Sequence, residues 1–263
     1  MTDRKKEIIK RFEENVKGKI PQINGVNVKH DGKEGHWLET QMGITHNANN
    51  EPDLFGYEMK NQTTSGKTTF GDWSADEYIY IHGRKNKGIN DLNKEYLITR
   101  NQFLFIFGKE NISKNNRVSW SGEPCPTYYG DTTTFGQTLT MDNDENIIIV
   151  YDYSKDVRYN KSTIVPLNMQ KDGLLIAKWY KETLKSKLEK KFNINGWFTC
   201  TKNGLGEYEK IHFGPSIDYQ TWINLFKQRV VFFDSGMYYG NNRPYSQWRA
   251  MNTFWKQLIE ETY

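Results

Sequence analysis

The amino-acid sequence predicts an α/β fold, because patterns typical of helices and of strands alternate along its 263 residues. Apolar residues recur every three to four positions within 3–16 and 174–192, which is the spacing of a buried helical face. Residues 146–153 instead contain an almost unbroken apolar run, which is typical of a buried strand. A chain of this length is expected to form one large domain or two lobes that share a core.

The other elements follow in order along the chain. After the helix at 3–16 and a polar connector, Trp37, Leu38 and Met42 have helical spacing in a second helix that Gly43 ends. Residues 109–144 are rich in Gly, Asn, Thr and Pro, which predicts hairpins and loops outside the main core. Strands or hairpins are predicted at 53–60, 76–82, 103–107, 146–153, 196–201, 209–213 and 230–233, and further helices at 174–192, 219–226 and 253–261.

Composition excludes several classes of protein. The formal net charge of +4 is too small for a protein that coats DNA without specificity. The charged N-terminus is not a signal peptide and no apolar run reaches membrane-spanning length, so a cytoplasmic protein with no membrane partner is expected. Cys125 and Cys200 lack metal-ligand spacing, and two free thiols are expected, with a disulfide between them as the alternative.

The segment from Pro52 to Lys60 carries the strongest chemical signal. Strand alternation places Glu58 and Lys60 on one face, and Gly56 marks a turn or close backbone approach just before them. Asp53 and Glu58 can then meet at one cation, and two hard carboxylates suit Mg²⁺. Such a group is what metal-dependent cleavage of a phosphodiester needs. Lys60 would then lie near the attacking water or the phosphate. The alternative is a strand with a solvated, charged face.

The residues upstream strengthen the catalytic interpretation. Leu38-Glu39 and Met42-Gly43 lie on the predicted helix, with Glu39 fourteen positions before Asp53. This arrangement resembles the MutH-like branch of the PD-(D/E)xK nucleases, in which a Leu-Glu-x-x-Leu-Gly helix precedes the Asp and Glu-x-Lys elements. The gap from Asp53 to Glu58 is most similar to that of the MvaI/BcnI-type restriction endonucleases.

The resemblance implies a PD-(D/E)xK core, with a central mixed β-sheet flanked by helices, and a second lobe that recognises DNA. It implies a catalytic lobe at 1–108, continued by about 146–200, and a recognition lobe at 109–145 and 201–263. The implied protein is a monomeric type II restriction endonuclease that cleaves double-stranded DNA at a CCNGG-like site with Mg²⁺, paired with a cognate DNA methyltransferase. The implied catalytic residues are Glu39, Asp53, Glu58 and Lys60, with the Met59 carbonyl as a third metal ligand beside Asp53 and Glu58.

Two further segments are similar to DNA-contacting parts of these enzymes. The hydroxyl-rich segment after Lys60 would donate hydrogen bonds to phosphates; its candidates are Thr63, Thr64, Ser65 and Lys67. Near the C-terminus, a Gly-aromatic loop and the following strand would read bases, with arginine binding guanine and asparagine binding adenine. The candidates there are Tyr239, Asn241, Asn242, Arg243 and Arg249, in a loop where the family carries histidines.

Three alternatives remain. A MutH-like enzyme that nicks one strand during repair would use the same residues. A non-catalytic DNA-binding or glycan-binding module would explain the 14% aromatic content. His46, among Asn47, Asn49 and Asn50, suggests a ββα-metal nuclease, but the strand and helix patterns of that fold are missing around it.

Overall fold

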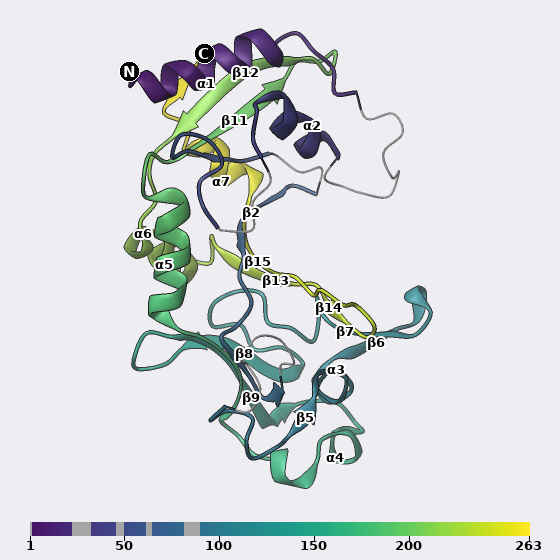
Figure 1. Ribbon diagram of the computed structural model, residues 1–263. Coiled ribbons are helices and arrows are strands. Elements are labelled where there is room, and N and C mark those ends of the chain that lie inside the picture. Colours follow the sequence, from purple (N-terminus) through teal and green to yellow (C-terminus); the bar gives the residue numbers. More distant parts are fainter. Residues whose placement is uncertain (1, 23–32, 46–49, 62–64, 82–89) are drawn as a thin grey trace. The chain divides into compact units, whose positions relative to one another are not determined.

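The computed structural model describes residues 2–22, 33–45, 50–61, 65–81 and 90–263 (Figure 1). The chain divides into two compact units. Unit 1 comprises Met1–Thr69, Lys185–Trp222 and Ala250–Tyr263, and unit 2 comprises Phe70–Leu184 and Ile223–Arg249. These two units have other boundaries than the lobes expected from the sequence, which are 1–108 with 146–200 and 109–145 with 201–263. The catalytic and recognition roles of the lobes stay a prediction.

Unit 1 is built on a mixed sheet of four strands in the order β1-β11-β12-β16. β1 runs parallel to β11, whereas β11 pairs antiparallel with β12, and β12 with β16. A mixed sheet flanked by helices is the α/β class that the sequence predicts. The elements that lie in this unit are α1 (Asp3–Asn15), α2 (Lys33–Gln41), β1 (Glu58–Met59), β11 (Trp197–Lys202), β12 (Tyr208–Gly214), α7 (Asn252–Gln257) and β16 (Glu261–Thr262).

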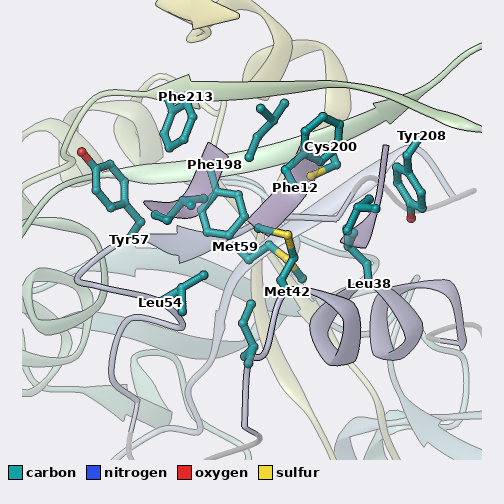
Figure 2. Packing of buried hydrophobic residues seen from close by; sticks show 14 residues of the cluster. Phe12, Leu38, Met42, Leu54, Tyr57, Met59, Phe198, Cys200, Tyr208 and Phe213 are labelled. Atoms are coloured by element: carbon teal, nitrogen blue, oxygen red, sulfur yellow. The ribbon is translucent and has the colours of Figure 1, made fainter. Parts of the chain in front are cut away.

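Helices cover both faces of this sheet. On one face, Phe12 of α1 and Leu38 of α2 belong to the same buried apolar cluster as Phe198 of β11, as Figure 2 shows. Trp197 directly precedes Phe198 in the strand and therefore points to the other face, where its ring centroid lies 5.1 Å from that of Trp255 in α7. Each buried large apolar side chain contributes about 1.5–3 kcal/mol, so this packing holds β1 and β11 from both sides.

Unit 2 contains a second sheet of four strands in the order β3-β10-β9-β8, all antiparallel, and two smaller sheets, β14-β7-β6 and β4-β5. Its core is aromatic: Trp179 contacts both Phe233 and Trp248, with ring centroids 5.0 and 5.4 Å apart. The elements of unit 2 are β3 (Glu77–Tyr78), β4 (Tyr80–Ile81), β5 (Ile98–Thr99), α3 (Arg100–Phe107), β6 (Lys109–Asn111), η1 (Ile112–Lys114), β7 (Arg117–Trp120), β8 (Phe135–Met141), β9 (Ile147–Asp156), α4 (Lys161–Ile164), η2 (Leu167–Met169), β10 (Leu174–Trp179), β13 (Phe232–Ser235) and β14 (Met237–Tyr238).

Four elements contain the points at which the chain passes from one unit to the other. β15 lies between β13 and β2 in a sheet of three strands. The four elements are β2 (Lys67–Asp72), α5 (Lys181–Phe192), α6 (Tyr219–Lys227) and β15 (Ser246–Met251).

The strand predicted at 103–107 is wrong, because these residues belong to helix α3. Thr99 and Gln102 form a capping box: the Thr99 hydroxyl accepts from the Gln102 amide at 3.2 Å, and the Gln102 side chain accepts from the Thr99 amide at 2.7 Å. This cap satisfies two backbone donors at the helix start. Phe103, Leu104 and Phe107 are fully buried and Phe105 is 55% exposed, a distribution that a helix produces.

The single helix predicted at 174–192 is a strand followed by a helix. Residues 174–179 form β10, which pairs with β9 along its length, and α5 begins only at Lys181. The final helix is also shorter than predicted: α7 ends at Gln257, and Glu261–Thr262 add strand β16 to the sheet of unit 1. In both places the sheet supplies hydrogen-bond partners that lie far away in the sequence.

Candidate active site

A tight turn positions the acidic segment of unit 1. Leu54 and Tyr57 exchange both backbone hydrogen bonds, at 3.0 and 2.9 Å, around Phe55 and Gly56. Both central residues have positive φ, 51° and 86°, as in the two-residue turns that match the twist of a hairpin. A Cβ at Gly56 would lie 2.6 Å from the side-chain nitrogen of Asn195. The predicted turn and close approach at Gly56 are therefore confirmed.

This turn and β1 bring Asp53, Glu58 and Lys60 together. The Met59 amide donates a hydrogen bond to Asp53 Oδ2 at 2.9 Å, and Lys60 Nζ donates to Glu58 Oε1 at 2.7 Å. Glu58 is 2% exposed and Lys60 is 6% exposed. The Glu58 amide bonds the Gly196 carbonyl at 3.0 Å, which fixes the edge of the sheet that carries both side chains. The half-buried carboxylate of Asp53 thus lies in one group with the buried carboxylate of Glu58 and the buried ammonium of Lys60.

Lys191 is a fourth member of this group, and the sequence does not predict it. It lies on α5, and its Nζ is 3.0 Å from Glu58 Oε1, the same oxygen that Lys60 contacts. Glu58 Oε2 is buried and has no hydrogen-bond partner among the residues that the structure describes. Local sequence gives no signal for Lys191, because α5 carries several lysines and only its packing selects this one.

Burial shifts the pKa values of two members of the group, Asp53 and Lys60. Removal from water, with the nearby negative charge of Glu58, raises the pKa of Asp53 to about 7. Burial lowers the pKa of Lys60, and the positive charge of Lys191 adds to that effect. Carboxyl and ammonium groups whose pKa values move toward neutrality are typical of sites that bind metal ions or transfer protons.

Glu39 lies on α2, half-buried, with its Oε2 3.6 Å from His36 Nδ1. Across the ranges that the structure describes, no three or more His, Cys, Asp or Glu side chains lie close enough to share a metal ion. Glu39 therefore does not complete a set of three carboxylates with Asp53 and Glu58. Its predicted catalytic role stays a prediction.

The donor set of the group fits a hard divalent cation. Asp53 and Glu58 supply carboxylate oxygens, and the backbone carbonyl of Met59 follows Glu58 directly in the sequence. The two lysines contact only Oε1 of Glu58, so the buried Oε2 is an acceptor that no donor of the described residues reaches. A buried acceptor of this kind is costly unless a cation or a hydrogen bond satisfies it. Oxygen donors with room for waters suit Mg²⁺.

The predicted phosphate contacts follow the cluster in the sequence. Thr63 and Thr64 lie outside the described residues. Ser65 is exposed in the turn before β2, and Lys67 is the first residue of that strand. Their contacts with DNA stay a prediction.

The residues predicted to read bases differ in their contacts within unit 2 and in their exposure. The Asn241 side chain donates to the Gly236 carbonyl at 3.0 Å and accepts from the Tyr238 amide at 3.3 Å, so it stabilises its own loop. Arg249 forms an ion pair with Asp234 at 2.7 Å. Three others of the set are exposed: Tyr239, Asn242 and Arg243. Base contacts by any of the five stay a prediction.

Cys125 and Cys200 are both buried and free, as predicted. His46, on which the ββα-metal alternative rested, lies outside the described residues. Within the described ranges, no helix has the length and apolar character needed to cross a bilayer.

Comparison with known proteins places this arrangement in a family. The model of the LlaMI restriction endonuclease family matches residues 16–263. The type II restriction enzyme ScrFI of Lactococcus lactis subsp. cremoris is 48% identical over 275 residues, which cover all of both chains. The structure of the restriction endonuclease MvaI in complex with its cognate DNA substrate has the same fold, with a TM-score of 0.59 at 12% identity, over 100% of this chain and 98% of that one.

The family match spans most of the chain, and ScrFI matches along its whole length. The fold agrees with the PD-(D/E)xK core that the sequence predicts. The chain therefore belongs to the LlaMI restriction endonuclease family and is a type II restriction enzyme.

Proposed function

We propose that this enzyme hydrolyses phosphodiester bonds in both strands of a short, specific double-stranded DNA site, with Mg²⁺ as its cofactor. The observation that carries the proposal is the group of Asp53, Glu58 and Lys60, in which the buried Glu58 Oε2 has no donor among the described residues. The names of ScrFI, a type II restriction enzyme, and of the MvaI–DNA complex support the same substrate class.

Asp53, Glu58 and the Met59 carbonyl would hold the cation. Bound there, Mg²⁺ would polarise the scissile phosphate and lower the pKa of a bound water. The ammonium of Lys60 would orient that water or offset negative charge that grows on the phosphate. Glu39 would position a metal-bound water or contribute to a second metal site. Thr63, Thr64, Ser65 and Lys67 would hold the backbone in register, as phosphate contacts do.

The finer features of the proposal come from the resemblance to MvaI/BcnI-type enzymes. The site is CCNGG-like, and the enzyme acts as a monomer that cuts the two strands in separate events. It works in the cytoplasm beside a cognate DNA methyltransferase that protects the host site. Tyr239, Asn241, Asn242, Arg243 and Arg249 contribute to base recognition in unit 2.

Digestion of a mapped supercoiled plasmid with Mg²⁺, followed by sequencing of the ends, tests the proposal. Full linearisation at one recurring sequence is expected. Persistent nicked circles would instead favour a MutH-like enzyme. Replacing Asp53→Asn should abolish cleavage, whereas Glu209→Gln, at an exposed position of β12 in the same unit, should not. Cleavage that survives Asp53→Asn, or that survives EDTA, would overturn the proposed metal site.

A further inference from the structure

Unit 2 has a hollow of about 1040 Å³ beside the β6–β7 hairpin. The charged side chains that line it are Lys109, Lys114, Arg117, Arg158 and Glu110. Arg158 is neutralised by Asp156 at 2.6 Å, and Lys109 contacts Glu123. Arg117 and Lys114 form no ion pair within the part of the chain that the structure describes. With the negative charge of Glu110 set against Lys114 and Arg117, the hollow keeps a small net positive charge, which suits an anionic polymer.

Arg117 is held in a fixed orientation at the start of β7. Its guanidinium carbon lies 3.8 Å from the ring centre of Tyr238. Tyr238 is itself fixed, because β14 pairs with β7 and places Tyr238 opposite Ser119. Arg117 Nε is buried and has no hydrogen-bond partner among the described residues. A stacked, planar guanidinium loses little conformational entropy when its free edge forms hydrogen bonds.

Two exposed aromatic side chains lie at the same hollow. Phe105 is 55% exposed and Tyr239 is 49% exposed, and their ring centroids are 5.6 Å apart. Aromatic faces beside unpaired cations are typical of surfaces that bind nucleic acid. Arg249, in contrast, already has a carboxylate partner.

We infer that Arg117 is a specificity-determining residue that binds O6 and N7 of one guanine in the DNA site. The inference rests on the proposed function, since it requires that the enzyme bind specific duplex DNA. The guanidinium fork matches the two parallel acceptors of guanine in the major groove, and guanine is the base that arginine reads most often. Lys114, exposed on the same hairpin, contacts a neighbouring phosphate.

The test measures DNA binding without Mg²⁺, with 7-deazaguanine, which lacks the N7 acceptor, placed at each guanine of the mapped site in turn. Arg117→Met removes the fork but keeps an unbranched stem, and Arg117→Lys keeps the charge. The matched control is Arg229→Lys, because Arg229 in the same unit also lies over a tyrosine ring, that of Tyr128, and pairs with Asp131 outside the hollow.

The wild-type enzyme and the Arg229→Lys variant should lose affinity when one particular guanine is modified. Arg117→Met should bind the unmodified site about 5- to 150-fold more weakly, the range of one bidentate base contact. It should lose nothing further when that guanine is modified. Arg117→Lys should cleave sites with a substituted base at that position more readily, relative to the intact site, than the wild type does.

A 7-deazaguanine penalty that persists in Arg117→Met overturns the inference, because Arg117 would then bind a phosphate or only support the fold. If Arg117→Met fails to fold, Arg117→Lys decides: unchanged discrimination at every position overturns the inference, and relaxed discrimination at one guanine supports it. A wild-type enzyme that neither binds nor cleaves DNA would instead overturn the proposed function.

Discussion

Each unit buries a carboxylate beside cationic side chains: Glu58 in unit 1 and Asp156 in unit 2. Both are 2% exposed. Asp156 accepts hydrogen bonds on both oxygens, from Arg158 at 2.6–3.1 Å and from the Tyr151 hydroxyl at 2.9 Å. Glu58 accepts on Oε1 alone, from Lys60 and Lys191, and its Oε2 is buried without a donor in the described structure.

The difference separates a structural ion pair from a site prepared for a ligand. Although burial acts to raise it, the pKa of Asp156 is lowered by the hydrogen bonds from Arg158, so its charge is stabilised by the protein itself. Asp53 in unit 1 is not compensated in this way, because burial and the nearby charge of Glu58 raise its pKa to about 7. An incompletely satisfied buried carboxylate is costly unless a cation completes it.

The largest expected effect concerns Glu58. Glu58→Gln keeps the shape but removes the charge that would bind the metal. Single-turnover cleavage should fall by about a thousandfold or more, since a bound cation supplies several kcal/mol and each tenfold corresponds to about 1.4 kcal/mol. Glu209→Gln is the matched control and should cleave normally. Cleavage that stays within about tenfold of wild type would remove Glu58 from the metal site.

Asp156→Asn should have the opposite character: a loss of stability without a loss of chemistry. Arg158 would be left buried without its charge partner, which destabilises by about 3 kcal/mol. Urea unfolding followed by tryptophan fluorescence measures the change, and the cleavage rate of the folded variant at saturating DNA should be unchanged. Asp91→Asn, at the exposed pair with Lys94, is the control and should not alter unfolding. A variant as stable as wild type would show that the pair does not stabilise unit 2.

The contrast between the two carboxylates also shows which contacts of a site can be predicted from local sequence. The spacing of Asp53, Glu58 and Lys60 sufficed to predict their meeting, because a tight turn and one strand connect them. Lys191 was not predictable, because the packing of α5 against the sheet brings it to Glu58 from far along the chain. No motif distinguishes Arg158 as the partner of Asp156 either, although the two are only two residues apart.

The fold errors have the same physical origin. The apolar run at 103–107 fits the residue spacing of a helix as well as that of a strand. The capping box at Thr99, together with tertiary packing, makes it a helix. Residues 174–179 have apolar positions that fit a helix, but their pairing with β9 makes them a strand. The strand at β9, whose apolar run is nearly continuous, and the helix α1, whose stripe is regular and whose start Thr2 caps, were predictable from local pattern alone.

A third, smaller effect concerns pH. Mg²⁺ binding requires the ionised form of Asp53, whose pKa is about 7 in the metal-free protein. Mg²⁺ affinity should therefore rise by up to about tenfold per pH unit below neutrality and level off above it. Isothermal titration calorimetry across this range measures the slope, and Asp53→Asn should remove it. An affinity that does not change between mildly acidic and neutral pH would contradict the raised pKa.

The same titration predicts a change in stability of known sign. The folded pKa of Asp53 is above its ordinary value of 3.8, so between these values the folded protein holds a proton that the unfolded chain has released. The unfolding free energy of the metal-free enzyme should therefore contain a contribution that is present at low pH and lost as pH rises through about 7. Asp156, whose pKa is lowered, contributes in the opposite direction: its stabilisation is lost as pH falls.

The smallest expected effect concerns Lys191. It tests whether the charge of Lys191 shifts the pKa values of Asp53 and Lys60. The positive charge of Lys191 lowers the pKa of both Asp53 and Lys60. Lys191→Met should therefore raise both pKa values and leave more Asp53 protonated at neutral pH. Cleavage at pH 7 should fall by about tenfold, as for other residues that support metal ligands. The matched control is Lys190→Met, because the neighbouring Lys190 pairs with Glu51 at 3.1 Å.

The shape of the pH–rate profile decides whether Lys191 acts through charge. If it does, the acid limb of the Lys191→Met profile moves to higher pH and most of the lost rate returns in alkaline solution, where Asp53 is ionised in both enzymes. A loss that is equal at every pH would mean that Lys191 only packs α5 against the sheet. In that respect Glu58 would resemble Asp156 despite its unsatisfied oxygen, because a cationic partner of each carboxylate would only stabilise the fold.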